Sequence, residues 1–261
     1  MPLEEIINRQ GIIISAPASG AGKTTVTLGL INAFARKRSV QPFKSGPDYI
    51  DSKFQSVAAD RPSYNLDTWA MSSSDILNMI GMVGPSDICI AEGSMGLFDG
   101  VISKGAGGNG STADLASITN WPVILVVDCA KQAQSVAALI TGFNSFRHDI
   151  TIGGVILNNI SSKRHEALVV SEVSKTKVPI LGVIPRSNEL TIPERHLGLV
   201  QAEDLSDLEQ LIFKLGTLIE ENCDLEAIAC TARNSFPPIS TLQKITPPAQ
   251  RIAIARDNAF T

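Results

Sequence analysis

The sequence has few histidines, no excess of basic charge and no long apolar run, and each shortage excludes a class of function. Its three histidines lack metal-ligand spacing with one another or with a cysteine, so no zinc site is expected. With 22 basic and 26 acidic residues, the formal net charge of −4 argues against a nucleic-acid-binding surface. No apolar run reaches the roughly 18 residues of a membrane span. We therefore expect no nucleic-acid partner and no membrane contact.

Cysteine is also sparse, and its placement indicates no covalent chemistry. The thiols at 89, 129, 223 and 230 form no C-x-x-C pair, and Cys89 and Cys129 lie in apolar runs, where burial makes a thiol inert. No cysteine has an adjacent histidine that could act as its base. The acidic N-terminal residues MPLEEIINRQ lack the basic and apolar parts of a signal peptide. We expect a cytoplasmic protein with reduced thiols.

What the chain does contain is a repeated alternation of two patterns. Apolar residues make up 44% of the sequence, enough for a sizeable core. Short runs rich in Val and Ile are typical of strands buried on both faces, and they occur at 11–15, 40–44, 87–92, 122–128, 153–158 and 179–184. Helix-like segments occupy 23–38, 52–60, 73–83, 112–119, 132–146, 163–176 and 206–221. This alternation predicts a doubly wound, mostly parallel α/β sheet with helices on both faces and ligands at the carboxyl ends of its strands.

The strongest local motif is SAPASGAGKTT at 15–25, which joins the first predicted strand to the first predicted helix. Loop amides and a helix N-terminus favour an anion, Lys23 adds charge for the β- and γ-phosphates, and the Thr24 hydroxyl suits Mg²⁺. The motif departs from G-x-x-x-x-G-K-[ST] because Pro17 stands where the first glycine belongs. We predict a P-loop NTPase type of fold whose nucleotide-binding residues are Ser19, Gly20, Ala21, Gly22, Lys23, Thr24 and Thr25.

Charged residues follow the other predicted strands. The segment QPFKSGPDYID at 41–51 contains Lys44, Asp48 and Asp51, which beside a P-loop offer a cation for phosphate and carboxylates for Mg²⁺. Glu92 ends the run ICIAE, where an acid in a P-loop protein reaches the metal, often through water. Asp99 lies in a glycine-containing loop, where it is either a turn residue or a functional acid.

Two further segments allow more than one interpretation. The stretch SKGAGGNGSTADLA at 103–116 places Ser111 and Thr112 at a predicted helix start, which resembles a second anion site, and a flexible lid is a compatible alternative. Asn158 can offer a donor and an acceptor to an adenine edge, although an Asn at a strand end is more often a helix cap. Neither His196 nor the loop 105–110 receives a role from the sequence.

Together these segments resemble the cobyrinic acid a,c-diamide synthase family. The match runs through PASGAGKTT, QPFKSGPDYID, YNLD at 64–67, EGSMGLFDG, GSTADLA, PVILVVD, GVILNN, LGVIPR and PERHLGL. PDYID and GLFDG at this spacing are more specific than the P-loop alone. The family's ATP-binding domain is similar to dethiobiotin synthetase and precedes a class I glutamine amidotransferase domain. The glutaminase Cys, His and Glu have no counterpart here, so the chain resembles the synthetase half.

The resemblance implies a reaction and a set of residue roles. ATP phosphorylates the a and c acetate carboxylates of a tetrapyrrole acid, and ammonia displaces phosphate from the resulting acyl phosphate. Phosphate contacts are implied for Lys23 and Lys44, and Mg²⁺ contacts for Thr24, Asp51 and Glu92. The remaining implied contacts are to substrate or ammonia for Asp48 and Asp99, to adenine for Asn158, and to substrate for Tyr49, Ser111 and Thr112.

The resemblance leaves rival functions open. A nickel-sirohydrochlorin a,c-diamide synthase shares the same motifs. A ParA/MinD-like ATPase switch carries a second lysine early in its P-loop, where this chain has Ala18, and no terminal amphipathic helix for membrane docking is visible. Dethiobiotin synthetase is disfavoured by PDYID, GLFDG and the Pro-rich stretch, and cobyric acid synthase by the GLFDG loop.

The C-terminal part predicts a domain boundary. We expect a synthetase domain at 1–222, a Pro-rich linker at 223–250, and at 251–261 the first strand of an amidotransferase domain that is absent from this chain. The alternative is that this strand joins the edge of the first sheet. The expected partners are the tetrapyrrole acid and the glutaminase domain, and a homodimer is compatible with the sequence.

Overall fold

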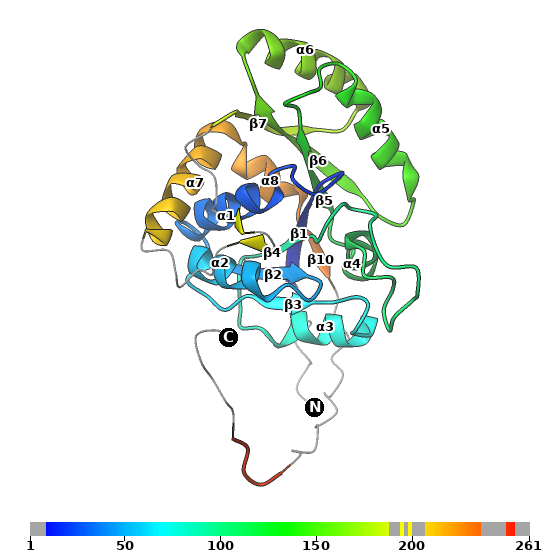
Figure 1. The fold of residues 1–261 in the computed structure, drawn as a ribbon, viewed down its shortest axis with the longest axis vertical. Helices are drawn as coiled ribbons and strands as arrows, with labels where there is room; N and C mark the ends of the chain where they lie inside the picture. Colours follow the sequence, from blue (N-terminus) through cyan, green and yellow to red (C-terminus); the bar gives the residue numbers. More distant parts are fainter. Residues whose placement is uncertain (1–8, 188–193, 196–197, 200–206, 236–248, 254–261) are drawn as a thin grey trace.

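A central parallel sheet organises the molecule. The computed structural model describes residues 9–187, 194–195, 198–199, 207–235 and 249–253 (Figure 1). The parallel strands follow the order β3-β2-β4-β1-β5-β6-β7. Their bounds are β1 (Arg9–Ser15), β2 (Val40–Ser45), β3 (Tyr64–Leu66), β4 (Ile88–Glu92), β5 (Val123–Asp128), β6 (Ile152–Ile160) and β7 (Ile180–Pro185). This arrangement confirms the predicted doubly wound fold of the P-loop NTPase type.

Helices cover both faces of the sheet (Figure 1). Successive residues of β1 point alternately into two cores. Ile12 and Ile14 pack into the core beneath α1 (Lys23–Ala35), α2 (Tyr49–Ala59), α7 (Leu208–Asn222) and α8 (Leu225–Thr231). Ile13 packs into the core beneath α3 (Ser73–Met82), α4 (Thr112–Thr119), α5 (Val136–Phe146) and α6 (Lys163–Val173). The short 3-10 helix η1 (Ser174–Thr176) follows α6, and β8 (Glu194–Arg195) pairs with β9 (Gly198–Leu199).

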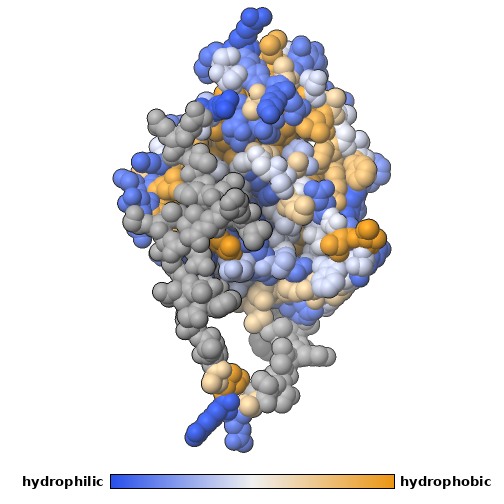
Figure 2. Space-filling model, in the orientation of Figure 1, coloured by the Kyte–Doolittle hydropathy of each residue, from blue (hydrophilic) through white to orange (hydrophobic). Residues whose placement is uncertain are grey.

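The described surface is mixed in character. In Figure 2, exposed apolar residues occur in small separate groups among hydrophilic ones, and hydrophilic residues dominate the end of the molecule near α6. Scattered apolar side chains of this kind are ordinary on protein surfaces. Among the described helices, none combines the length and apolar character that crossing a membrane requires.

The structure differs from the predicted linker over the first part of 223–250. Asp224 caps α8 by accepting a hydrogen bond from the amide of Ala227, and Ile228 is fully buried. After α8, β10 (Arg233–Ser235) pairs antiparallel with the beginning of β1. It can do so because β5 joins β1 only from Ile13 onward, which leaves the first residues of β1 unpaired on that side. Residues 236–248 and 254–261, which hold most of the predicted linker and strand, lie outside the described residues.

Helices α1 and α7 approach each other closely, and Gly29 of α1 and Gly216 of α7 allow the contact. A Cβ added to Gly29 would lie 2.5 Å from Cγ1 of Ile219 and 2.8 Å from the carbonyl oxygen of Leu215. At the same crossing, Arg36, the C-cap residue of α1, donates to Glu220 at 2.6 Å. Because α1 begins at the predicted P-loop, this packing fixes the helix that presents the loop.

Gly29→Ala therefore tests the crossing, with Gly142→Ala as its matched control. Both glycines lie in helix interiors, but a Cβ on Gly142 would meet nothing within 4 Å. We expect Gly142→Ala to raise the free energy of unfolding by about 0.5–1 kcal/mol through helix propensity. Gly29→Ala is expected to lower it by about 1–3 kcal/mol through overpacking. Urea unfolding followed by circular dichroism measures both, and equal responses would contradict the packing argument.

Thiol reactivity tests the burial of the cysteines. Burial raises the pKa of Cys89 to about 11 and those of Cys129 and Cys223 to about 12, whereas Cys230 is exposed. Since the thiolate is the reactive form, we expect only Cys230 to react rapidly with Ellman's reagent at pH 8 in the native protein. Cys230→Ser should remove the rapid phase, and a rapid phase that survives this substitution would show that another thiol is accessible.

Candidate active site

The P-loop occupies the carboxyl end of β1, as predicted. Gly20 and Gly22 have φ angles of 78° and 85°, in the left-handed region that side chains other than glycine rarely adopt. Gly22 is the N-cap of α1, and its carbonyl oxygen accepts the amide of Val26 at 3.0 Å. The loop therefore delivers its amides and the positive end of the α1 dipole to one place.

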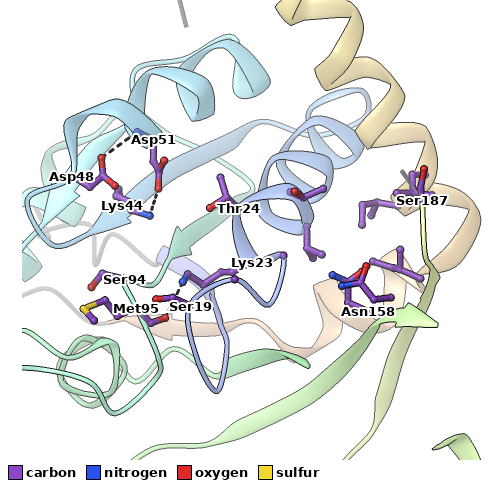
Figure 3. A pocket seen from close by; sticks show the side chains of 18 of the residues that line it. Ser19, Lys23, Thr24, Lys44, Asp48, Asp51, Ser94, Met95, Asn158 and Ser187 are labelled. Atoms are coloured by element: carbon purple, nitrogen blue, oxygen red, sulfur yellow. Dashed lines mark hydrogen bonds and ion pairs between the residues drawn. The ribbon is translucent and has the colours of Figure 1, made fainter. Parts of the chain in front are cut away.

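A cavity of about 480 Å³ opens beside this loop (Figure 3). One end is charged and the other apolar. Its lining includes Ser19, Gly20, Gly22, Lys23, Thr24, Thr25, Lys44, Asp48, Asp51, Ser94, Met95, Asn158, Asn159, Ile184, Pro185, Ser187, Leu218 and Ile219. Every residue predicted to bind nucleotide is therefore in the lining except Ala21, which is buried beneath it. The shape suits a ligand with a phosphate end and an apolar end.

A buried charge cluster lies at the charged end of the cavity. One oxygen of Glu92 accepts the Thr24 hydroxyl at 2.7 Å and lies 3.2 Å from the ammonium of Lys44. The other oxygen of Glu92 accepts the side-chain amide of Gln55 at 2.8 Å. Lys44 also pairs with Asp51, and Glu92 is fully buried. We name these five residues the charge cluster: Thr24, Lys44, Asp51, Gln55 and Glu92.

The ammonium of Lys44 pairs with two carboxylates, those of Asp51 and Glu92, and this arrangement shifts the pKa values of Lys44 and Asp51. Burial alone would lower the pKa of Lys44, but the carboxylates of Glu92 and Asp51 outweigh burial and hold the pKa above its ordinary value. Burial, and next the charge of Glu92, raise the pKa of Asp51 to about 6, against the opposing effect of Lys44. Lys44 is therefore charged at neutral pH, and the cluster carries more negative than positive charge when both carboxylates are ionised.

Lys23 lines the cavity and is half-buried. Its ammonium donates to the carbonyl oxygen of Met95 at 2.8 Å, and burial lowers the pKa of Lys23 below its ordinary value. Met95 has a φ of 48°, an uncommon conformation for a residue with a side chain. Lys23 thus joins the P-loop to the loop at 93–100 that follows β4, and a phosphate would have to compete with this carbonyl for the ammonium.

The donor set suits Mg²⁺ at the charged end. Thr24 and Asp51 line the cavity with a hydroxyl and a carboxylate, whereas Glu92 lies behind Thr24 and outside the lining. Hard oxygen donors with few carboxylates match Mg²⁺, which keeps several waters. Within the described residues, no group of three or more His, Cys, Asp and Glu side chains could hold a metal by itself. A magnesium ion here would therefore share its ligands with phosphate and water.

Asn158 lies at the border between the P-loop and the apolar end of the cavity (Figure 3). Its amide nitrogen donates to the carbonyl oxygen of Ala21 at 3.0 Å, which leaves the side-chain oxygen to act as an acceptor. The next residue, Asn159, has a φ of 60° and donates to Asp128 at 2.9 Å. Ile184 and Leu218 line the same cavity and offer apolar contacts to a flat ring. A hydrogen bond between Asn158 and adenine stays a prediction.

A second, larger cavity of about 1040 Å³ adjoins the first. The two share Asp48, Asp51, Ser94 and Met95. The second is also lined by Ser45, Gly46, Pro47, Tyr49, Ile50, Asp67, Trp69, Asp99, Gly100, Val101, Asn109 and Gly110. The structure thus brings Asp48, Tyr49 and Asp99 together as predicted. Sequence reasoning missed the roles of Asp67 and Trp69 in this wall, although the YNLD segment pointed to their neighbourhood.

The hydroxyls of the predicted second anion site bond within the chain. Ser111 caps α4 by accepting the amide of Asp114 at 3.2 Å, and the Thr112 hydroxyl donates to the carbonyl oxygen of Ser94 at 3.2 Å. Both side chains are buried, and neither lines a cavity described here. Both hydroxyls thus have partners within the chain, and their contact with substrate stays a prediction. His196 lies outside the described residues.

Comparison with known proteins agrees with this geometry. Residues 12–200 match the family model described as CbiA: CobQ/CobB/MinD/ParA nucleotide binding domain. A protein of Rhodobacter capsulatus named hydrogenobyrinate a,c-diamide synthase is 45% identical over 253 residues, covering 97% of this chain and 58% of that protein. A Brucella anthropi protein of the same name is 44% identical, covering 96% of this chain and 58% of its own length. The chain thus spans less than two thirds of these relatives.

Solved structures are more distant. The MinC:MinD cell division protein complex of Aquifex aeolicus is similar with a TM-score of 0.48 and 16% identity, covering 69% of this chain and 83% of that chain. The family match covers the P-loop, the charge cluster and most residues that line the two cavities. The chain belongs to the CobQ/CobB/MinD/ParA nucleotide-binding domain family.

Proposed function

We propose that this chain is the ATP-dependent synthetase part of an a,c-diamide synthase, which converts the a and c acetates of a hydrogenobyrinate- or cobyrinate-type tetrapyrrole into amides during cobalamin biosynthesis. The observation that carries the proposal is the adjacency of the two cavities, which share Asp48, Asp51, Ser94 and Met95. A nucleotide in the first cavity would present its terminal phosphate to an acid in the second. The names of the relatives support a tetrapyrrole acid as the substrate.

The first step needs charge neutralisation more than a protein nucleophile. An acetate oxygen attacks the terminal phosphorus of ATP, a C–O–P linkage forms, and ADP leaves. P-loop amides and Lys23 hold the phosphates, and Lys44 brings a positive charge to the wall of the first cavity. Thr24 and Asp51 would hold Mg²⁺, which supplies further charge neutralisation when bound. Glu92 orients both Thr24 and Lys44 from behind.

The second step joins nitrogen to carbon. Ammonia attacks the carbonyl carbon of the acyl phosphate, the bond to the phosphate oxygen breaks, and the nitrogen loses one proton. Asp48 and Asp99 line the second cavity with carboxylates that can accept N–H groups and take that proton. We assign the supply of ammonia to a glutamine amidotransferase partner outside this chain, as the resemblance implies. Homodimer formation stays a prediction.

Lys23→Ala tests the nucleotide site. Removal of the ammonium should weaken ATP binding roughly 10- to 100-fold, since a hydrogen bond to a charged group is worth about 1.5–3 kcal/mol. Isothermal titration with ATP and Mg²⁺ measures the dissociation constant. Lys37→Ala, which removes an exposed lysine outside both cavities, is the matched control and should bind as the unaltered protein does. Unchanged ATP affinity in Lys23→Ala would refute the assignment.

A second prediction concerns the nitrogen donor. The chain should amidate hydrogenobyrinate with ATP, Mg²⁺ and ammonium but not with glutamine, because three of its four cysteines have raised pKa values and the exposed one has no role in either cavity. Mass spectrometry would follow product formation. Glu92→Gln, which keeps the size of the side chain but removes its charge, should abolish turnover. Release of glutamate from glutamine would contradict the prediction.

A further inference from the structure

The wall of the second cavity carries negative charge, although the proposed substrate is itself an acid. Asp48, Asp51, Asp67 and Asp99 line the cavity, and no lysine or arginine is among the described residues that do so. Attraction between charges therefore does not account for binding of an anionic macrocycle against this wall. Contact with the uncharged faces of the ring system can supply the affinity that this wall does not.

Apolar side chains supply such a surface. Trp69, Met95 and Val101 line the cavity and are 48%, 61% and 52% exposed, respectively. Ligand pockets are roughly 300–1,000 Å³ in volume, so this cavity, at about 1040 Å³, suits a large ligand. A large exposed indole in such a cavity offers a flat contact to a conjugated ring system, since aromatic faces stack in offset arrangements. Trp121, the other tryptophan, is buried in the core.

The backbone of Trp69 is held on both sides. Its amide donates to the side chain of Asp67 at 2.9 Å, and its carbonyl oxygen accepts the amide of Ala106 at 2.8 Å. A Cβ added to Gly105 would lie 1.9 Å from that same oxygen, so only glycine fits there. The amide of Gly107 donates to the carbonyl oxygen of Thr68 at 2.9 Å. The glycine-rich segment 105–108 is therefore packed against the segment that carries Trp69.

We propose that Trp69 is the aromatic platform on which one face of the tetrapyrrole macrocycle stacks, and that segment 105–108 is the clamp that positions it. The inference rests on the proposed function and adds a specificity-determining residue to it. An aromatic side chain has only two rotatable bonds, so it loses little conformational freedom when a ligand binds, which favours affinity. This contact selects a broad conjugated ring over a small carboxylic acid, and it leaves the phosphoryl chemistry to the neighbouring cavity.

The test compares Trp69→Ala and Trp69→Phe with the unaltered chain. Hydrogenobyrinate is titrated into each protein and binding is followed by the absorbance of the macrocycle, while ATP affinity is measured separately by calorimetry. We expect Trp69→Ala to weaken macrocycle binding roughly 10- to 100-fold, as loss of aromatic stacking on a nucleobase does. Trp69→Phe should restore most of the affinity. ATP binding and kcat should stay unchanged, so the effect falls on KM.

Two further variants separate stacking from general damage. Phe213→Ala removes an aromatic residue that is 58% exposed and lines neither cavity, and it should bind the macrocycle normally. Gly105→Ala should weaken macrocycle binding while Trp69 is still present, because it displaces the clamp. Quenching of tryptophan fluorescence by the bound macrocycle should be weaker in Trp69→Phe than in the unaltered chain, since the buried Trp121 is then the remaining tryptophan.

The outcomes distinguish this inference from the function on which it rests. If the unaltered chain binds ATP but not hydrogenobyrinate, the proposed function and the platform both fail. If the unaltered chain binds and amidates the macrocycle, and Trp69→Ala does so with the same KM, only the platform is overturned. A fall in kcat without a change in KM would also overturn it, since that result indicates a role in chemistry.

Discussion

The pairing of Lys44 with two buried carboxylates is the interaction on which the site depends. It joins β2, which carries Lys44, to α2 through Asp51 and to β4 through Glu92, and Glu92 extends it to α1 through Thr24. Removal of one partner from a buried ion pair costs about 3–5 kcal/mol, because the remaining charge stays uncompensated. The same contacts that align these four elements therefore set the charge at the junction of the two cavities.

The loop that follows β4 lies at the junction of the two cavities and lines both of them. It carries Ser94 and Met95 into both cavities, and its glycines allow close approach. At Gly96, a Cβ would lie 2.7 Å from the carbonyl oxygen of Pro17 in the P-loop and 2.6 Å from Asp99. Lys23 bonds to the same loop through Met95. Phosphate binding at Lys23 would thus alter the contact that holds this loop, which couples occupancy of one cavity to the shape of the other.

Much of the fold was accessible from the sequence because its strands are buried on both faces. Continuous apolar runs marked six of the seven parallel strands, and the caps Ser72 and Ser111 fit the predicted starts of α3 and α4. The shorter elements β3, α8 and β10 were missed. The residues Arg233–Ser235 are polar and have no strand pattern, and they form β10 only because the first residues of β1 have an open side.

The sequence allowed us to predict which residues lie at the site, but not which of them contact one another. Motif spacing identified Lys44, Asp51 and Glu92, but it could not show that they neutralise one another. The role of Ser111 stays a prediction, because a serine that caps its own helix and a serine that binds an anion have the same local sequence. The wall formed by Trp69 depends on packing between segments far apart in the chain, for which no local pattern exists.

The pairing of β10 with β1 sets the direction in which the chain leaves the sheet after Ser235. Since β10 runs antiparallel to the first residues of β1, the chain at Ser235 points away from the edge of the sheet where both cavities open. The seven residues of β1 span roughly 23 Å, whereas residues 236–250 can extend to roughly 50 Å at most. A group tethered beyond Ser235 therefore reaches the cavities only if its tether turns back and spans the length of β1.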